Sequence, residues 1–134
     1  MNRVKRCKNS YTVEIPLKLP SLNEYIHECN RNRYKGGSLK RNTEESIALF
    51  INCLPEFENP VSIKFKWVEK NRKRDLDNIA FGKKFILDAL TKQGKLKNDT
   101  PRYVTSFEDT FEYEKDYKVI LTITENKGAE HEDT

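Results

Sequence analysis

The stretch Arg72–Leu90 (RKRDLDNIAFGKKFILDAL) decides how the rest of the chain is interpreted. Three cations run directly into two carboxylates, Asp75 and Asp77, which are separated only by Leu76. From Asn78 onward the apolar residues recur at helical spacing, which predicts a helix. Aspartate and asparagine are favoured helix caps, and the positive end of a helix stabilises nearby carboxylates by about 0.3–1 kcal/mol. We therefore expect the two acids between the end of a strand and the first turn of its helix.

The predicted helix has an apolar face and a charged face. With residues placed about 100° apart, the apolar face gathers Ile79, Gly82, Phe85, Ile86, Ala89 and Leu90. The opposite face carries Asp77, Lys84 and Asp88, so Lys84 is the lysine on the side of the acids. Lys83 falls among the apolar residues, and we expect its stem to lie along the edge of the core with its ammonium group reaching water.

Two acids beside three cations have two interpretations. In the first, the aspartates cap the helix and the cations compensate their charge. In the second, the acids bind a divalent cation, because Mg²⁺ prefers oxygen ligands and keeps its other positions for water and substrate phosphates. Neighbouring cations would then hold a polyanionic substrate, and a lysine could stabilise charge that develops on phosphorus. The residues alone leave both interpretations open.

An ordered set of short motifs resembles the RusA family of Holliday-junction resolvases. The set comprises RDLDN at Arg74–Asn78, then Lys84, DAL at Asp88–Leu90, Gly94, and Asn98–Asp99 before Val104. Pro20–Tyr25 resembles the family's flanking sequence more loosely. The resemblance implies that Asp75, Asp77 and Asp99 ligate Mg²⁺ (or Mn²⁺) and that Lys84 is the catalytic lysine.

The spacing of the lysine departs from the family pattern. Lys84 follows Asp77 by about two helical turns, where many family members have about one. This spacing keeps the lysine on the same helix face but lengthens its distance from the metal by about 5 Å. The choice between Lys83 and Lys84 as the catalytic lysine stays open.

The resemblance implies a Mg²⁺-dependent endodeoxyribonuclease that resolves Holliday junctions by paired, symmetric nicks during recombination and repair. The metal would activate water and stabilise the oxyanions of the displacement. The expected partners are four-way DNA and a second copy of the chain, since a homodimer matches the two-fold character of a junction. Gly82 is a candidate dimer contact, because a glycine inside a helix costs about 1 kcal/mol and often permits close approach. Two alternatives are a non-catalytic nucleic-acid-binding module and a metal nuclease acting on other branched or single-stranded DNA.

A second basic stretch, Asn30–Arg41 (NRNRYKGGSLKR), surrounds a Gly-Gly pair and one tyrosine. It is either a solvated loop or an arm that grips phosphates, in which Tyr34 could stack on an unpaired base. The candidate DNA-binding residues here are Arg31, Arg33, Lys35, Lys40 and Arg41. Those of the central stretch are Arg72, Lys73, Arg74 and Lys83.

Length and charge limit the class of protein. A chain of 134 residues is one ordinary domain, large enough to bury roughly two thirds of its unfolded surface. Charged residues make up 34% of it, but an aromatic content of 10% supports a core rather than disorder. The net charge of +4 is modest, so local runs of Lys and Arg say more about a polyanionic partner.

The cysteines and the N-terminal segment indicate a compartment. Cys7, Cys29 and Cys53 are far apart and lack zinc-ligand spacing, which predicts free thiols in a reducing environment. The basic segment 1–10 lacks the apolar stretch of a secretory signal, and no apolar run approaches the length of a membrane span. We therefore expect a soluble, cytoplasmic protein of bacterial or phage origin.

The remaining patterns predict an α/β (α+β) domain with a mixed sheet of about four strands and two main helices. Alternation predicts strands at Tyr11–Leu17, Val61–Trp67, Tyr103–Tyr113 and Val119–Ile123, the last two joined as a hairpin. A helix capped by Asn42 or Thr43 should bury Ile47, Phe50, Ile51 and Leu54. Residues 1–125 form the domain and 126–134 a polar tail. This arrangement requires the loop after the central helix to return Asp99 to the acid pair.

Overall fold

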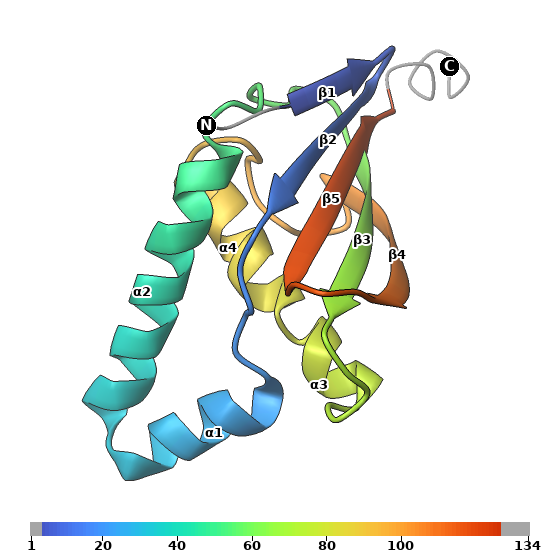
Figure 1. The fold of residues 1–134 in the computed structure, drawn as a ribbon. Coiled ribbons are helices and arrows are strands. Elements are labelled where there is room, and N and C mark those ends of the chain that lie inside the picture. Colours follow the sequence, from blue (N-terminus) through green and yellow to red (C-terminus); the bar gives the residue numbers. More distant parts are fainter. Residues whose placement is uncertain (1–3, 127–134) are drawn as a thin grey trace.

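A five-stranded sheet with helices packed on one face makes up the computed structural model, which describes residues 4–126 (Figure 1). The strands are β1 Val4–Cys7, β2 Ser10–Ile15, β3 Val61–Glu69, β4 Val104–Tyr113 and β5 Lys118–Glu125. The helices are α1 Leu22–Arg31, α2 Arg33–Ile51, α3 Leu76–Ala80 and α4 Lys83–Lys92. The predicted mixed α/β class is confirmed. The sheet has one strand more than expected because the basic segment before Tyr11 forms β1.

The strand order is β1-β2-β5-β3-β4, and β3 and β4 are the parallel pair. Parallel neighbours need a crossover, which α4 supplies. The other neighbouring pairs are antiparallel. The predicted hairpin of the last two strands is wrong, because β5 lies between β2 and β3 while β4 occupies the edge. This order places the start of β4 beside the start of β3, which determines where Asp99 lies.

The core lies between the sheet and the pair α2 and α4. Phe65 and Trp67 of β3 face the helices and are 1% and 2% exposed, whereas Lys64 and Lys66 point to the open face of the sheet. The helices bury the predicted stripes, which include Ile47 and Ile51 of α2 and Phe85, Ile86, Ala89 and Leu90 of α4. These predictions are confirmed, and they account for how α4 docks on the sheet.

The predicted central helix is two helices. Phe81 and Gly82 separate α3 from α4, and the backbone of both residues stays in the right-handed helical region. Gly82 is buried in its own chain: a Cβ there would lie 3.1 Å from Leu19 and 3.2 Å from Trp67. The predicted dimer contact at Gly82 is therefore wrong. Gly94, the predicted end of the helix, has a φ of 74°, as expected for a glycine beyond a C-cap.

The second basic stretch is helical rather than a loop. α1 begins with a capping box in which the Ser21 hydroxyl accepts from the Glu24 N–H and the Glu24 carboxylate accepts from the Ser21 N–H. α2 begins at Arg33, because the Asn32 side chain accepts from the Lys35 N–H and caps the new helix. The predicted start at residue 42 or 43 is wrong by about ten residues.

The remaining expectations concern the thiols, a membrane and the tail. Cys7, Cys29 and Cys53 are free and exposed, as predicted. No helix within residues 4–126 is long and apolar enough to cross a membrane. Asn126 belongs to the fold, since its N–H donates to the Pro60 carbonyl at 2.8 Å. The rest of the predicted tail lies outside the described residues.

Candidate nucleic-acid interface

The acid pair lies where the sequence predicts it, at the start of α3 after the end of β3. Asp75 is the N-cap residue of α3, although its side chain makes no capping hydrogen bond. Asp77 accepts the N–H of Asn78 at 3.0 Å. Both carboxylates are exposed. This arrangement is that of a helix start with acids in its first turn.

Asp99 does not reach the acid pair. It lies in the connection between α4 and β4, at the end of the sheet where β3 begins (Figure 1). The Val61 N–H donates to the Tyr103 carbonyl at 2.8 Å, which fixes this connection beside the start of β3. Asp75 and Asp77 follow the other end of β3, and a nine-residue strand is about 26 Å long. The described residues hold no group of three His, Cys, Asp or Glu side chains that could bind a metal ion.

Both candidate catalytic lysines are engaged elsewhere. Lys84 is exposed and pairs with Asp88 one turn further along α4, at 3.5 Å. Lys83 lies at the edge of the core as expected, with its Nζ 2.8 Å from Asp109 and 4.6 Å from the ring centre of Phe107. Its ammonium group is therefore paired with a carboxylate rather than free to bind DNA.

Arg74 is also committed within the chain. Its guanidinium binds both carboxylate oxygens of Glu69 and donates to the Leu19 carbonyl at 2.9 Å. Burial tends to lower the pKa of Arg74, but the Glu69 carboxylate outweighs this effect, so the pKa lies above its ordinary value. Arg74 thus holds the β3–α3 loop (residues 70–75) in place, and its DNA-binding role stays a prediction.

Lys40 is the third cation held by internal contacts. Its Nζ lies 2.6 Å from Glu44, which is 4% exposed, and 3.0 Å from Asp88. Lys92 contacts the other carboxylate oxygen of Glu44. Burial tends to lower the pKa of Lys40, but the two carboxylates raise it above its ordinary value. This cluster joins α2 to α4, so Lys40 serves packing and is not a free cation.

The cations left exposed gather at the junction of α1 and α2, which we call the corner (residues 30–41). They are Arg31, Arg33, Lys35 and Arg41. The corner contains no acidic residue, and of these four cations only Arg31 makes an ion pair within residues 4–126, with Glu28 at 3.4 Å. Tyr34 projects from the same segment with 81% of its surface exposed. Solvated cations without acidic neighbours are suited to binding phosphates.

Gly36 brings the two helices of the corner together. A Cβ at this position would lie 2.4 Å from the Cys29 sulfur and 3.1 Å from the Cys29 Cα. No side chain fits there without moving α1 away from α2. The glycine therefore fixes the angle at which the corner presents its cations.

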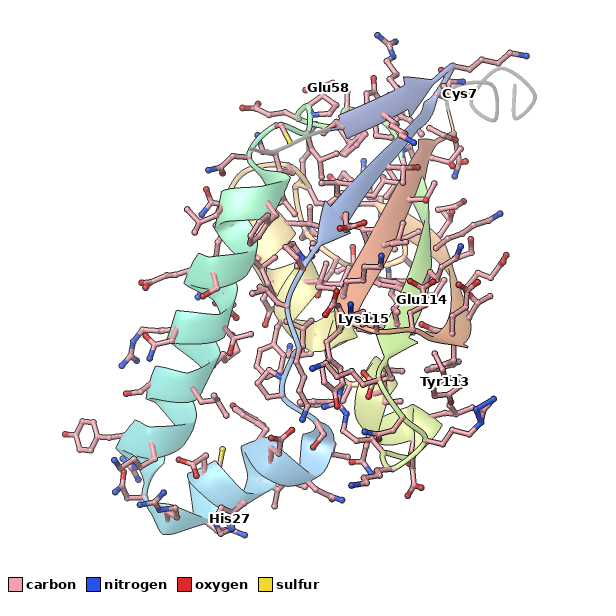
Figure 2. The ribbon with its side chains drawn as sticks, viewed as in Figure 1. Cys7, His27, Glu58, Tyr113, Glu114 and Lys115 are labelled. Carbon is pink, nitrogen blue, oxygen red and sulfur yellow. The ribbon has the colours of Figure 1, made fainter. Side chains whose placement is uncertain are left out.

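A second group of cations lies at the end of the sheet where β3 finishes. It joins the predicted Arg72 and Lys73 to Lys18 and Lys70, which the sequence patterns did not indicate. Lys18 and Lys70 both lie over the ring of Tyr117, with their Nζ atoms 4.8 and 5.6 Å from its centre. The Arg72 guanidinium lies 4.0 Å from the ring centre of Tyr113, which Figure 2 shows at the end of β4. Lys18 and Tyr117 are far from residues 70–73 along the chain, so no local motif could have revealed the whole group.

None of the cations Lys18, Lys70, Arg72 and Lys73 forms an ion pair with another residue of the described range 4–126. The corner and this second group lie at the two ends of α1, along one margin of the molecule (Figure 1). The fold therefore defines a small α+β protein with a one-sided sheet and two groups of exposed cations at that margin.

No family model matches the sequence, and no curated protein does. Two solved structures of the periplasmic domain of Helicobacter pylori MotB are similar in fold, with TM-scores of 0.46 and 0.45. Each is 12% identical to this chain and covers 97% of it, with 83% and 85% of the MotB chains matched. A likeness at this level carries no argument about function.

The prediction of a Holliday-junction resolvase is wrong. The implied ligands Asp75 and Asp77 lie at the opposite end of the sheet from Asp99, so the three carboxylates do not form the shared metal site on which this prediction depended. The catalytic roles of these residues and of Lys84 depended on one shared site, so they are not retained. Mg²⁺ binding and homodimer formation stay predictions.

Proposed function

We propose that the protein is a nucleic-acid-binding module that contacts the phosphate backbone through its corner. The observation that carries this proposal is a difference between two sets of cations: one is paired with carboxylates inside the fold and the other is exposed. The paired set is Arg74, Lys83 and Lys40. The corner cations face water, and no acid lies within their segment.

Electrostatics favour a polyanionic partner. Each lysine or arginine that neutralises a phosphate releases condensed counterions, and this release supplies most of the sequence-independent affinity for nucleic acid. Four such cations on a short segment give a high local positive charge, although the net charge of the whole chain is only +4. Arginine is the larger part of the set, and its planar fork suits phosphate oxygens.

The second group extends this surface. Arg72 and Lys73 lie in a loop that the Arg74–Glu69 pair holds against the sheet. Cations that rest on tyrosine rings, as Arg72 does on Tyr113, lose less freedom when they bind a phosphate. We propose that this loop contacts the same strand or duplex as the corner does.

Binding is tested by fluorescence anisotropy with labelled single-stranded, duplex and four-way DNA, at salt concentrations between about 50 and 200 mM. If all four corner cations contact phosphates of a single strand, the plot of log K against log salt has a slope of about −3. Arg33→Gln and Arg41→Gln should each weaken binding to every substrate and make that slope shallower by about 0.7–1.

Arg102→Gln is the matched control. Arg102 is an exposed arginine near the start of β4, away from the corner, and its replacement changes the net charge by the same amount. The proposal requires that it leave the slope unchanged. Equal losses from Arg102→Gln and Arg33→Gln would reduce the effect to net charge alone, and absence of salt-dependent binding would end the proposal.

A further inference from the structure

The side chain of Tyr34 is largely exposed and contributes little to the packing of the fold. Among the large hydrophobic side chains of residues 4–126 it has the highest exposed fraction, 81%, followed by Leu49 at 61%. Its ring makes no hydrogen bond, ring contact or cation contact with any other residue in that range. A single exposed aromatic side chain is common on protein surfaces, so exposure alone indicates nothing. What distinguishes Tyr34 is its surroundings.

Tyr34 shares a face of α2 with Gly37, Ser38 and Arg41. Residues separated by three, four and seven positions lie on one side of a helix. The Arg41 guanidinium turns back over this face: its Nη2 donates to the Ser38 hydroxyl at 3.3 Å. Its Nη1 lies 3.4 Å from the position that a Cβ on Gly37 would take. The Arg41 guanidinium therefore lies beside Gly37, about one helical turn (near 5 Å along the helix axis) from the Tyr34 backbone.

Between Tyr34 and Arg41 this face carries only the small side chain of Ser38, because Gly37 has none. At the neighbouring Gly36 the packing does require a glycine, because a side chain there would clash with Cys29 of α1. A Cβ at Gly37 would meet only the end of the Arg41 side chain, so packing within the protein does not require a glycine there. We call this strip of α2, from Tyr34 to the Arg41 guanidinium, the shelf.

We infer that this shelf binds one nucleotide of a single-stranded nucleic acid, with its base stacked on Tyr34 and its phosphate held by Arg41. The inference rests on the proposed function and adds the class of substrate. Stacking on an aromatic ring needs an unpaired base, because the faces of paired bases in a duplex are covered by their neighbours. Phosphate contacts alone do not distinguish a single strand from a duplex.

The test compares labelled single strands of oligo-dT and oligo-U of about 12 nucleotides with a duplex of the same length. Tyr34→Ala should weaken binding of the preferred single strand by about 5- to 150-fold, the effect of one stacked base. Duplex binding should change by less than about twofold, because its affinity comes from phosphate contacts. Tyr34→Phe keeps the ring and should keep the affinity.

Gly37→Leu provides an independent variant. Leucine is a good helix former, and its side chain would fill the shelf without removing a charge or the ring. It should reproduce the selective loss seen with Tyr34→Ala. Phe107→Ala removes another exposed aromatic side chain, 45% exposed on β4, and should leave both affinities unchanged. Urea unfolding followed by the fluorescence of Trp67 confirms that each variant is folded.

The outcomes separate this inference from the proposed function. Unchanged single-strand affinity in Tyr34→Ala, or equal losses for single strand and duplex, overturns the shelf while the salt-dependent binding of the corner stands. If the wild-type protein binds neither substrate, both are overturned. A selective loss in Tyr34→Ala and Gly37→Leu, with retention in Tyr34→Phe, supports the shelf.

Discussion

Arg74 donates hydrogen bonds from Nε and Nη2 to the two carboxylate oxygens of Glu69, at 3.0 and 2.7 Å. Glu69 is the last residue of β3 and is only 4% exposed. Replacing Arg74 by alanine leaves this buried carboxylate without its counter-charge, which typically costs about 3–5 kcal/mol. We expect Arg74→Ala to lower the free energy of unfolding by that amount, measured by urea titration with Trp67 fluorescence.

Arg72→Ala is the control for this prediction. Arg72 lies in the same loop and rests on Tyr113, but it is exposed and has no acidic partner within the described residues. An exposed cation–π contact is worth about 0.5–1 kcal/mol, so this variant should lose no more than that. Equal losses from the two variants would show that the Arg74–Glu69 pair does not anchor the loop.

The two adjacent glycines of α2 predict opposite effects of alanine. At Gly36 the added Cβ would lie 2.4 Å from the Cys29 sulfur and 3.1 Å from its Cα, so α1 must move. We expect Gly36→Ala to destabilise the protein by about 1–3 kcal/mol despite the better helix propensity of alanine. Gly37→Ala meets only the flexible end of Arg41 at 3.4 Å and should stabilise by up to about 1 kcal/mol.

Thermal and urea unfolding of the two glycine variants decide this point. The double variant Gly36→Ala with Cys29→Ala removes the closest contact and should recover part of the loss. Stabilisation of similar size at both glycines would mean that the two helices of the corner are not as closely packed as described.

The corner shows what local patterns missed. The segment with Gly36 and Gly37 was expected to form a loop or to precede a helix that starts at residue 42 or 43. Two signals pointed the other way: Ser21 and Glu24 at capping-box spacing, and Asn32 as a cap. Glycine disfavours an isolated helix by about 1 kcal/mol, but here its lack of a side chain is what lets α1 and α2 meet.

The strands and buried stripes were predictable because alternation and helical periodicity report which face is covered. The placement of Asp99 was not, because it depends on strand direction. Since β3 and β4 are parallel, the residues just before β4 return to the beginning of β3, away from Asp75. Likewise Asp109 accepts from the Trp67 indole at 2.8 Å because β4 pairs with β3 in a register that local sequence does not reveal.

Acid sensitivity should depend on Glu24. Burial tends to raise the pKa of Glu24, but hydrogen bonds from Ser21 and the charge of Arg74 outweigh it, so the pKa lies below its ordinary value of 4.5. A lowered pKa in the folded state means that the unfolded state binds the proton first. The stability that Glu24 contributes is therefore fully present above about pH 4.5 and lost as the pH falls through the lowered pKa.

We expect Glu24→Gln to flatten the dependence of the unfolding free energy on pH below about 4.5. Glutamine can still accept the Ser21 N–H in the capping box, so the stability at neutral pH should fall only slightly. Ser21→Ala removes the hydroxyl, one of the two Ser21 groups that lower the same pKa, and keeps the backbone N–H, so it should flatten the curve only in part. A curve for Glu24→Gln that follows the wild type throughout this range contradicts the assignment.

Glu44 should behave as a buried charge rather than as a surface ion pair. Its carboxylate contacts Lys40 at 2.6 Å and Lys92, and its 4% exposure shields it from salt. Glu44→Gln keeps the size but removes the charge, and we expect a loss of about 1–3 kcal/mol. The exposed pair Lys97–Glu58, at 3.7 Å, is the comparison: Lys97→Gln should cost less than about 1 kcal/mol.

Raising salt to about 1 M shortens the screening length to about 3 Å, so the cost of Lys97→Gln should vanish while that of Glu44→Gln persists. If the cost of Glu44→Gln also vanishes in high salt, the cluster that joins α2 to α4 is open to solvent and does not act as a buried ion cluster.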